Sequence, residues 1–447
     1  MRKTIKSLVA LSVLCLSMGA QAQVGNWRDM YKVKKKDTIF GIAKKYGLTV
    51  PELMDANPEM KKAGYELKKG DFIFIPYAKA TVDTSSTKKS VKAVTPSSTI
   101  HIGVMLPLHN VDGDGRRMIE YYRGMLMACD SLRREGISTD IHAWNVDIDA
   151  NISQFTKDPA AAKCDIIFGP LYTTQVQALA EFCKARNIKM VIPFSINGDD
   201  VSRYQQIFQV YQSADKLNNE AIEAFIKRFK GWHTVIIDCN DKDSKKGIFT
   251  FGLRNRLTNE GRKFSITNLN SSEEFFAKAF STTQPNVVIL NTGRAPELTV
   301  AIAKIQSYRA NHPKSRIALF GYTEWLMYTR QHLDDFFQLD TYVPSTFYYN
   351  ALDRRTQQFE QSYRRWFHSE MQYAFPRFAL TGYDQTQFFV RGLRKYGKGF
   401  KGLRSQSTYH PMQTPLQFKQ VSTAGMQNEN FQLIHYLPNQ TIESITY

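Results

Sequence analysis

From residue 99 onward the chain alternates short apolar runs with longer segments of helical character. The runs with strand character are residues 100–106, 140–145, 164–168, 189–193, 234–238, 263–267, 286–291 and 316–320. The segments predicted to be helices are residues 117–135, 174–187, 221–230, 247–261 and 297–310. Strands that are apolar on both faces are typical of parallel sheets covered by helices on each side. The sequence therefore predicts an α/β fold with doubly wound sheets.

The series of strands and helices starts again near Thr234, and residues 99–447 are more than one such sheet normally uses. We therefore predict two Rossmann-like lobes with a cleft between them. Ligands of open α/β sheets bind beyond the carboxyl ends of the strands. The turns to consider are those after Leu106, Phe168, Pro193 and Leu290.

Residues 31–76 form a separate, smaller pattern ahead of this domain. A short strand at 31–33 is followed by helices at 39–46 and 50–56 and by a closing strand at 71–76. Asp37 and Thr38 are suited to cap the first helix, and Pro51 stands in the first turn of the second. The expected order is strand, helix, helix, strand.

This segment resembles a LysM domain over its whole length, through the landmarks D-T-I at 37–39, I-A-x-x-Y at 42–46, N-P at 57–58 and I-P at 75–76. The resemblance implies binding of N-acetylglucosamine glycans such as peptidoglycan. It assigns the glycan contacts to two loops, with Asp37, Thr38, Ile39, Phe40, Tyr65 and Leu67 as candidates. For Phe40, Tyr46, Phe72 and Phe74 the alternative is packing in the core of the unit.

The larger domain resembles type I periplasmic solute-binding proteins of the leucine-binding group. The matching stretches include IHIGVMLPL at 100–108, DIIFGPLYTT at 165–174 and IKMVIPFS at 188–195. In that family the loop after G-P contacts a ligand carboxylate, which implies roles for Thr173 and Thr174. The turn after the next strand adds Ser195, and Glu324 would meet a ligand ammonium group. The alternatives are helix capping by the threonines and an exposed capping carboxylate at Glu324.

Two residues depart from the pattern of an amino-acid binder. Phe194 is bulky, and Ile196 lacks the expected hydroxyl group. The chain should cross between the lobes near Tyr211, 320–322 and 345–348, which would form a hinge or else a rigid interface.

Residues 1–22 read as a secretory signal, with Arg2, Lys3 and Lys6 ahead of an apolar run and a small-x-small cleavage site at 20–22. We expect an exported protein of the periplasm or cell wall. Residues 78–98 are rich in Ser, Thr and Lys and read as a flexible linker between a LysM domain at 31–77 and the domain at 99–447. Cys164 and Cys183 either pair or, like Cys129 and Cys239, stay buried free thiols.

The net charge of +18 is spread along the chain, so it indicates attraction to anionic envelope polymers and no nucleic-acid partner. No catalytic motif, metal-ligand spacing or cofactor fingerprint stands in a matching context. We therefore expect no enzymatic activity, metal or cofactor.

The leading hypothesis is a peptidoglycan-tethered protein whose two lobes bind a small polar solute, amino-acid- or peptide-like, for sensing or for an envelope transporter. The alternative is a scaffold or regulator that uses the same domain to contact a protein such as a cell-wall synthase.

Overall fold

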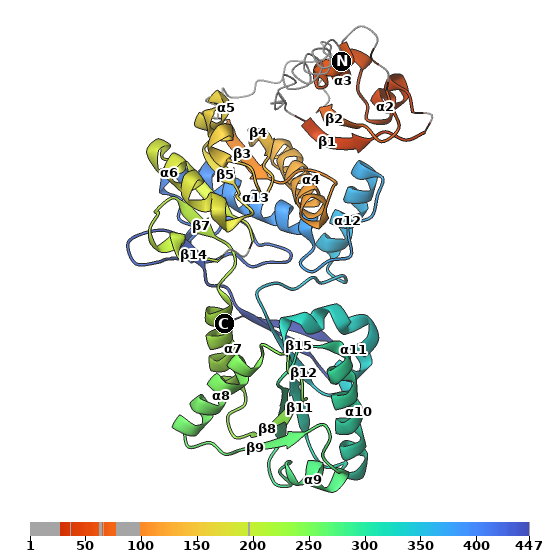
Figure 1. Cartoon of the computed structure of the whole chain (residues 1–447), viewed down its shortest axis with the longest axis vertical. Coiled ribbons are helices and arrows are strands. Elements are labelled where there is room, and N and C mark those ends of the chain that lie inside the picture. Colours follow the sequence, from red (N-terminus) through yellow and green to blue (C-terminus); the bar gives the residue numbers. More distant parts are fainter. Residues whose placement is uncertain are drawn as a thin grey trace, which may run out of the picture.

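The computed structural model describes residues 27–35, 37–61, 65, 67–76, 99–194 and 197–446. Within these residues the strands form one two-stranded sheet and two seven-stranded sheets (Figure 1). The expected signal, the expected linker, Ser195 and Ile196 lie outside the described residues. Among the described helices, none is both long and apolar enough to span a bilayer.

The first sheet belongs to the small N-terminal unit and pairs its two strands antiparallel. The elements of this unit are β1 (Trp27–Lys32), α2 (Ile39–Lys45), α3 (Val50–Asp55), the 3-10 turn η1 (Pro58–Lys61) and β2 (Phe72–Pro76). Thr38 caps α2 by accepting from the Gly41 N–H at 3.0 Å, as the sequence predicts. Thr49 and Glu52 form a capping box at the start of α3. The predicted order of strand, helix, helix and strand is confirmed.

Asn57 explains why the N-P pair ends the second helix of this unit. Its buried side chain donates to the Leu53 carbonyl at 2.7 Å and to the Phe74 carbonyl at 2.6 Å, and it accepts from the Phe74 N–H at 2.6 Å. One amide therefore ties the end of α3 to β2.

Lobe 1 is a mainly parallel sheet between helices, with the short β13 antiparallel at one edge. Its strands, in sheet order, are β13 (Phe418–Gln420), β14 (Met426–Asn428), β7 (Ile207–Gln209), β6 (Lys189–Ile192), β5 (Ile166–Phe168), β3 (Ile100–Leu106) and β4 (Thr139–Asn145). Its helices and 3-10 turns are α4 (Gly113–Arg134), η2 (Ile152–Lys157), α5 (Pro159–Ala162), η3 (Thr173–Gln175), α6 (Val176–Arg186), η4 (Asp200–Ser202), α12 (Arg354–Phe367), α13 (Phe378–Tyr396), η6 (Gly397–Gly399) and η7 (Arg404–Gln406).

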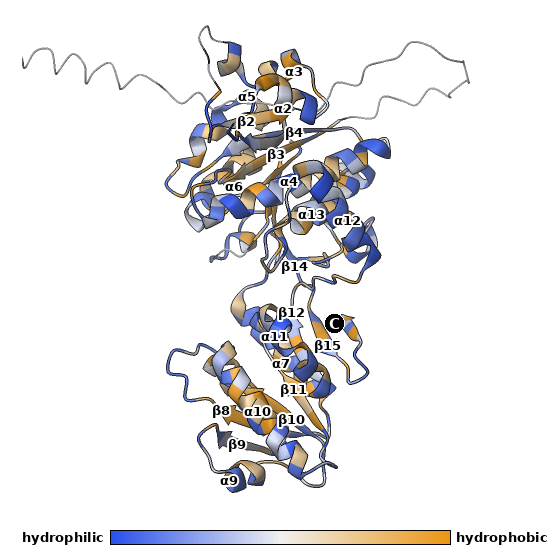
Figure 2. Ribbon diagram, turned by 90° about the vertical axis from the view of Figure 1, so that its right-hand side faces the viewer, coloured by the Kyte–Doolittle hydropathy of each residue, from blue (hydrophilic) through white to orange (hydrophobic). Residues whose placement is uncertain are grey.

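Lobe 2 repeats this plan, with the antiparallel β15 and β16 at one edge. Its strands, in sheet order, are β16 (Ile442–Thr446), β15 (Gln432–Tyr436), β12 (Thr341–Ser345), β11 (Ile317–Phe320), β10 (Asn286–Leu290), β8 (His233–Asp238) and β9 (Phe264–Asn268). Its helices are α7 (Ala214–Arg228), α8 (Gly247–Asn259), α9 (Glu273–Lys278), α10 (Ala295–Asn311), η5 (Thr323–Tyr328) and α11 (Thr329–Gln338). The apolar strands lie inside each lobe and the helices turn hydrophilic faces outward (Figure 2).

The predicted second lobe is present, but it begins at α7 and not at Thr234. Ala221, Ile222 and Phe225 of α7 pack into the core of lobe 2. The restart near Thr234 corresponds to β8, the first strand of lobe 2. Helix α7, which precedes β8, already belongs to this lobe.

The chain crosses between the lobes three times in the described residues, at 210–213, 346–353 and 429–431. Each crossing follows directly on a strand, namely β7, β12 and β14. Because the neighbouring strands run parallel to these, the carboxyl ends of both parallel sheets face the other lobe. Tyr211 and residues 346–348 therefore lie at crossings as predicted. Residues 320–322 do not, since they end β11 inside lobe 2, and the third crossing was not predicted.

Helices α4 and α13 of lobe 1 touch through their backbones. A Cβ atom on Gly124 would stand 1.9 Å from the Ala379 carbonyl oxygen, and one on Gly382 would stand 2.0 Å from that of Tyr121. The hydroxyl of Tyr121 also donates to the Gln385 side chain at 2.7 Å. The two glycines are required because any side chain would push the helices apart.

The small unit packs against lobe 1. The rings of Tyr46 and His368 meet edge to face with centroids 6.3 Å apart. Lys32 of β1 lines a cavity of about 280 Å³ whose wall includes Glu120 of α4. Both carboxylate oxygens of Glu120 accept from the Gln372 N–H, at 3.1 and 3.0 Å, and burial raises the pKa of Glu120 to about 7.

Candidate functional site

The candidate glycan face lies at the loop ahead of α2. The Asp37 carboxylate accepts from the Tyr31 hydroxyl at 2.8 Å and from the Lys34 N–H at 2.7 Å, which fixes the loop. Burial, followed by this hydrogen bond, raises the pKa of Tyr31 to about 12. Phe40 is 67% exposed, so the loop presents one large apolar side chain to solvent.

The other residues predicted for glycan contact have mixed surroundings. Thr38 is exposed but caps α2, and Ile39, Tyr65 and Leu67 are half-buried against the core of the unit. Among the aromatic residues considered for core packing, Tyr46 is buried. Phe74 is half-buried and Phe40 is exposed, so among these described side chains Phe40 is the strongest candidate for a sugar contact.

Thr173 and Thr174 stand at the carboxyl edge of lobe 1, in η3 after β5. Both are exposed, and neither hydroxyl caps η3 or α6. The buried Gln175 next to them anchors the turn by donating to the Asp147 carbonyl at 2.7 Å. The capping alternative is therefore not found, and both threonines are exposed on a turn that Gln175 anchors.

Phe194, after β6, occupies the same edge of lobe 1. The centroid of its ring lies 5.4 Å from the ring centroid of Tyr121 and 5.4 Å from that of Phe378. The ring also stacks on that of Tyr211, with centroids 6.1 Å apart. Tyr211 lies in the first crossing, and burial raises the pKa of its hydroxyl well above the ordinary value. Phe194, which departs from the pattern of an amino-acid binder, therefore belongs to an aromatic cluster at the edge of lobe 1 that faces lobe 2.

Glu324 stands at the matching edge of lobe 2, after β11. Its Oε1 accepts from the Lys246 ammonium at 2.6 Å, and that ammonium lies 4.8 Å over the Tyr322 ring. Its Oε2 is buried without a hydrogen-bond partner among the described residues. Glu324 is therefore an ion-paired carboxylate with one acceptor oxygen to spare, and not an exposed capping residue.

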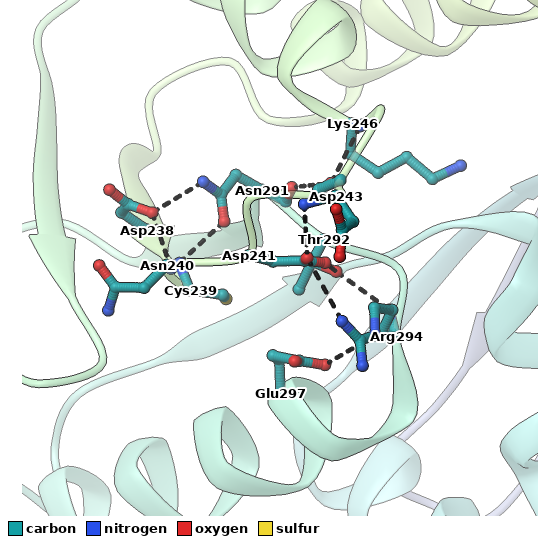
Figure 3. A network of polar contacts seen from close by, with 11 residues as sticks. Asp238, Cys239, Asn240, Asp241, Asp243, Lys246, Asn291, Thr292, Arg294 and Glu297 are labelled. Carbon is teal, nitrogen blue, oxygen red and sulfur yellow. Dashed lines mark hydrogen bonds and ion pairs between the residues drawn. The ribbon is translucent and has the colours of Figure 1, made fainter.

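Next to this pair, the turns after β8 and β10 are joined by a polar network (Figure 3). The Asp241 side chain, 1% exposed, accepts from the Thr292 hydroxyl at 2.7 Å and from Arg294 at 3.4 Å. The Thr292 hydrogen bond is the main cause that lowers the pKa of Asp241. Asn291 bridges the same turns, accepting from the Cys239 N–H at 2.8 Å.

The sequence prediction did not include this network. Its signal was the charged run D-K-D-S-K-K at 241–246 directly after an apolar strand. Ser244 links the network to Lys246, because its hydroxyl donates to the Asn291 carbonyl at 2.6 Å and accepts from the Lys246 N–H at 3.1 Å.

The four cysteines of the described residues are buried free thiols, so of the two alternatives for Cys164 and Cys183 the unpaired one is found. Burial raises the pKa of Cys129, Cys164 and Cys239 to about 12, which makes these thiols poor nucleophiles. No group of three His, Cys, Asp or Glu side chains in the described part of the chain is arranged to hold a metal ion.

Comparison with known proteins supports both parts of the architecture. Residues 31–76 match the LysM domain family, and no curated protein matches the chain. A putative branched-chain amino acid ABC transporter from Rhodospirillum rubrum is 13% identical, with a TM-score of 0.54, over 78% of this chain and 100% of its own. A substrate-binding protein from Desulfitobacterium hafniense, solved with Leu, is 15% identical, with a TM-score of 0.45 and coverage of 78% and 100%.

Identity this low shows a shared fold and nothing about the ligand. The predicted fold class is confirmed by the two parallel-dominated sheets and by this likeness. Residues 31–76 are a LysM domain, and the two-lobed part that follows has the type I periplasmic binding protein fold.

Proposed function

We propose that this chain is a non-enzymatic envelope protein that is held on peptidoglycan by its LysM domain and binds a small polar solute between its two lobes. The solute is amino-acid- or peptide-like, and its capture serves sensing or delivery to an envelope transporter. The observation that carries the proposal is that the carboxyl ends of both parallel sheets face each other across three crossings.

The polar groups at these facing edges suit a zwitterion. In lobe 2, Oε2 of Glu324 is buried without a hydrogen-bond partner among the described residues and would accept from a ligand ammonium group. The exposed hydroxyls of Thr173 and Thr174 in lobe 1 can donate to a carboxylate. Ser195 keeps the role that the family resemblance gives it, as a second contact from lobe 1.

The LysM domain supports the anchoring half of the proposal. Its exposed Phe40 can cover the apolar face of a sugar ring beside a loop that Asp37 makes rigid. A single LysM domain binds through a shallow surface, so the net charge of +18 adds attraction to anionic wall polymers.

One observation favours a second candidate function. The Phe194 cluster places aromatic rings where an amino-acid binder needs room and hydroxyl groups. In this alternative the two-lobed domain is a scaffold or regulator that contacts an envelope protein such as a cell-wall synthase.

A thermal-shift screen of the full chain against amino acids, short peptides, sugars and muropeptides separates the two candidates. A solute at 100 times its dissociation constant should add about 2.7 kcal/mol to the free energy of unfolding. No shift with any solute, together with capture of an envelope protein in a pull-down, would replace the solute-binding proposal by the scaffold. The anchor is tested separately, because deletion of residues 31–76 should abolish sedimentation with purified peptidoglycan.

A further inference from the structure

Lobe 1 has a cavity of about 480 Å³ on its helical layer, between α4, α12 and α13. These three helices lie next to one another in lobe 1 (Figure 2). None of Thr173, Thr174, Phe194 and Glu324 lines the cavity. Its volume falls in the range of about 300–1,000 Å³ that small-molecule sites occupy. It is therefore a second candidate site, separate from the facing edges of the two lobes.

The cavity has an excess of positive charge. Arg134, Arg355 and Arg365 line it, against the single carboxylate of Asp130. Asp130 is shared between Arg134 at 3.4 Å and Arg133 at 2.9 Å. Arg365 donates to the Ser362 hydroxyl at 3.0 Å and has no carboxylate partner among the described residues.

The third guanidinium is also only partly neutralised. Arg355 donates to the His410 carbonyl at 3.0 Å and lies 3.7 Å from the Asp353 carboxylate. The side chains of Arg134 and Arg355 are 69% and 49% exposed, so a ligand can reach them. Guanidinium groups that are exposed and only partly neutralised bind carboxylates readily, and they hold them through paired hydrogen bonds.

The rest of the lining is apolar and firmly held. Phe359 is buried under the cavity, with its ring 5.0 Å from that of Tyr383. The wall that contains Tyr409 and Met412 is fixed by the buried Asp384. That carboxylate accepts from the Tyr409 hydroxyl at 2.8 Å and from the Met412 N–H at 2.8 Å. The site is thus preorganised, with an aromatic base and a charged rim.

We propose that this cavity binds the stem peptide of uncrosslinked peptidoglycan, which rests on the proposed attachment of the chain to that polymer. A stem tripeptide that ends in diaminopimelate carries three carboxylates and one ammonium group when its amino end is acylated. Three guanidiniums and one carboxylate line the cavity, so the charges are complementary. A phosphate ligand fits less well because Asp130 would repel it, and an uncharged sugar makes no use of the arginines.

The test titrates the full chain with the N-acetylated tripeptide, which contains no sugar for the LysM domain, and follows binding by calorimetry. Arg365→Gln should weaken binding at least about tenfold, because it removes one guanidinium–carboxylate pair. Arg364→Gln is the matched control: it lies on the same helix, pairs with Glu370 and does not line the cavity. That variant should bind as the unaltered chain does.

Two further arms use inorganic phosphate and the peptide-free disaccharide, which should bind the LysM domain equally well in Arg365→Gln and in the unaltered chain. Tripeptide binding that depends on Arg365, with phosphate not binding comparably and disaccharide binding independent of Arg365, supports the proposal. Equal loss in the Arg364 and Arg365 variants, equal binding of phosphate, or no binding of the tripeptide overturns it. Sedimentation with peptidoglycan is read on the same variants. If the chain binds the tripeptide but does not sediment, the anchor proposal fails and the cavity assignment stands.

Discussion

Lys246 and Glu324 join two turns of lobe 2 that are far apart in sequence. The ammonium of Lys246 donates to Oε1 of Glu324 at 2.6 Å, while Oε2 stays without a partner among the described residues. The pair lies at the edge that faces lobe 1, and the Asp241 network holds the turn that carries Lys246 (Figure 3). The Glu324 carboxylate therefore forms an ion pair with Lys246 through one oxygen and keeps the other oxygen as a possible acceptor.

Glu324→Gln should reduce solute binding while leaving the free protein almost as stable. The Lys246 and Glu324 side chains are 28% and 43% exposed, so the pair contributes at most about 1 kcal/mol to the free energy of unfolding. Thermal shifts with and without solute measure both quantities. Glu260→Gln is the control, since Glu260 pairs with Arg256 at 2.9 Å at the far end of α8. An unchanged solute shift in Glu324→Gln would remove Glu324 from the site.

Phe40→Ala should reduce sedimentation with peptidoglycan with little effect on folding. The side chain is 67% exposed, so the free energy of unfolding should change by less than about 0.5 kcal/mol. Phe251→Ala provides the comparison, because Phe251 is 61% exposed on α8 of lobe 2, away from the LysM domain. Equal sedimentation of both variants would show that Phe40 is not a sugar contact.

Glu120 should make the folded state less stable as the pH rises. Its pKa is raised from 4.5 to about 7 by burial, so the folded state keeps a proton that the unfolded state has released. The contribution of Glu120 to the free energy of unfolding is fully present below about pH 4.5 and is lost as the pH rises to 7. The size of the pKa shift limits this contribution to about 3 kcal/mol. Asp384, whose pKa burial raises to about 6, acts in the same direction at lower pH.

Urea denaturation at several pH values between 5 and 7.5 checks this expectation. Glu120→Gln keeps an acceptor for the Gln372 N–H but cannot titrate, so its stability should depend less on pH than that of the unaltered chain. Glu135→Gln, at the exposed end of the same helix, should keep the original dependence. Identical pH dependence in all three proteins would contradict the prediction.

Gly382→Ala should destabilise lobe 1 by about 3 kcal/mol. The new Cβ would meet the Tyr121 carbonyl oxygen at 2.0 Å, and backbone cannot move aside as a flexible side chain can. Gly247→Ala is the control, because nothing lies within 4 Å of a Cβ at the start of α8. Chemical denaturation of the two variants measures the difference, and a similar stability for both would argue against close backbone contact between α4 and α13.

The sequence predicted what local pattern determines. Strands such as 100–106 and 286–290 are apolar on both faces, and this indicated parallel sheets and the lobed fold. The cap at Thr38 and the N-P stop likewise indicated the LysM domain locally, whereas the capping box at Thr49 was not predicted. Apart from the 3-10 turns, the elements not predicted are α5, β7, α9, α11, β12, α12, α13 and β13–β16. Several of these are strands of three residues, too short to show periodicity.

The other features that the sequence did not predict depend on contacts between residues that are far apart in the chain. Nothing near Met426 indicates that β14 will lie beside β7, more than 200 residues earlier. The arginine cavity has the same origin, because Arg134 and Arg365 belong to helices on either side of lobe 2 in the sequence. By contrast, Phe359, Tyr363 and Phe367 of α12 recur every four residues, and this spacing was a readable sign of an amphipathic helix.

The close backbone contact between α4 and α13, at Gly124 and Gly382, also sets an order of events while the chain is made. Helix α4 emerges early, but its partner α13 follows only after all of α7 to β12. Lobe 2 can form most of its core earlier, because five of its seven strands lie between Ala214 and Ser345, although Leu433 and Ile434 of β15 join that core only near the end of the chain. Lobe 1 meanwhile waits with an uncovered helical surface. A nascent chain of this protein therefore depends on protection from aggregation until nearly its last residues have appeared.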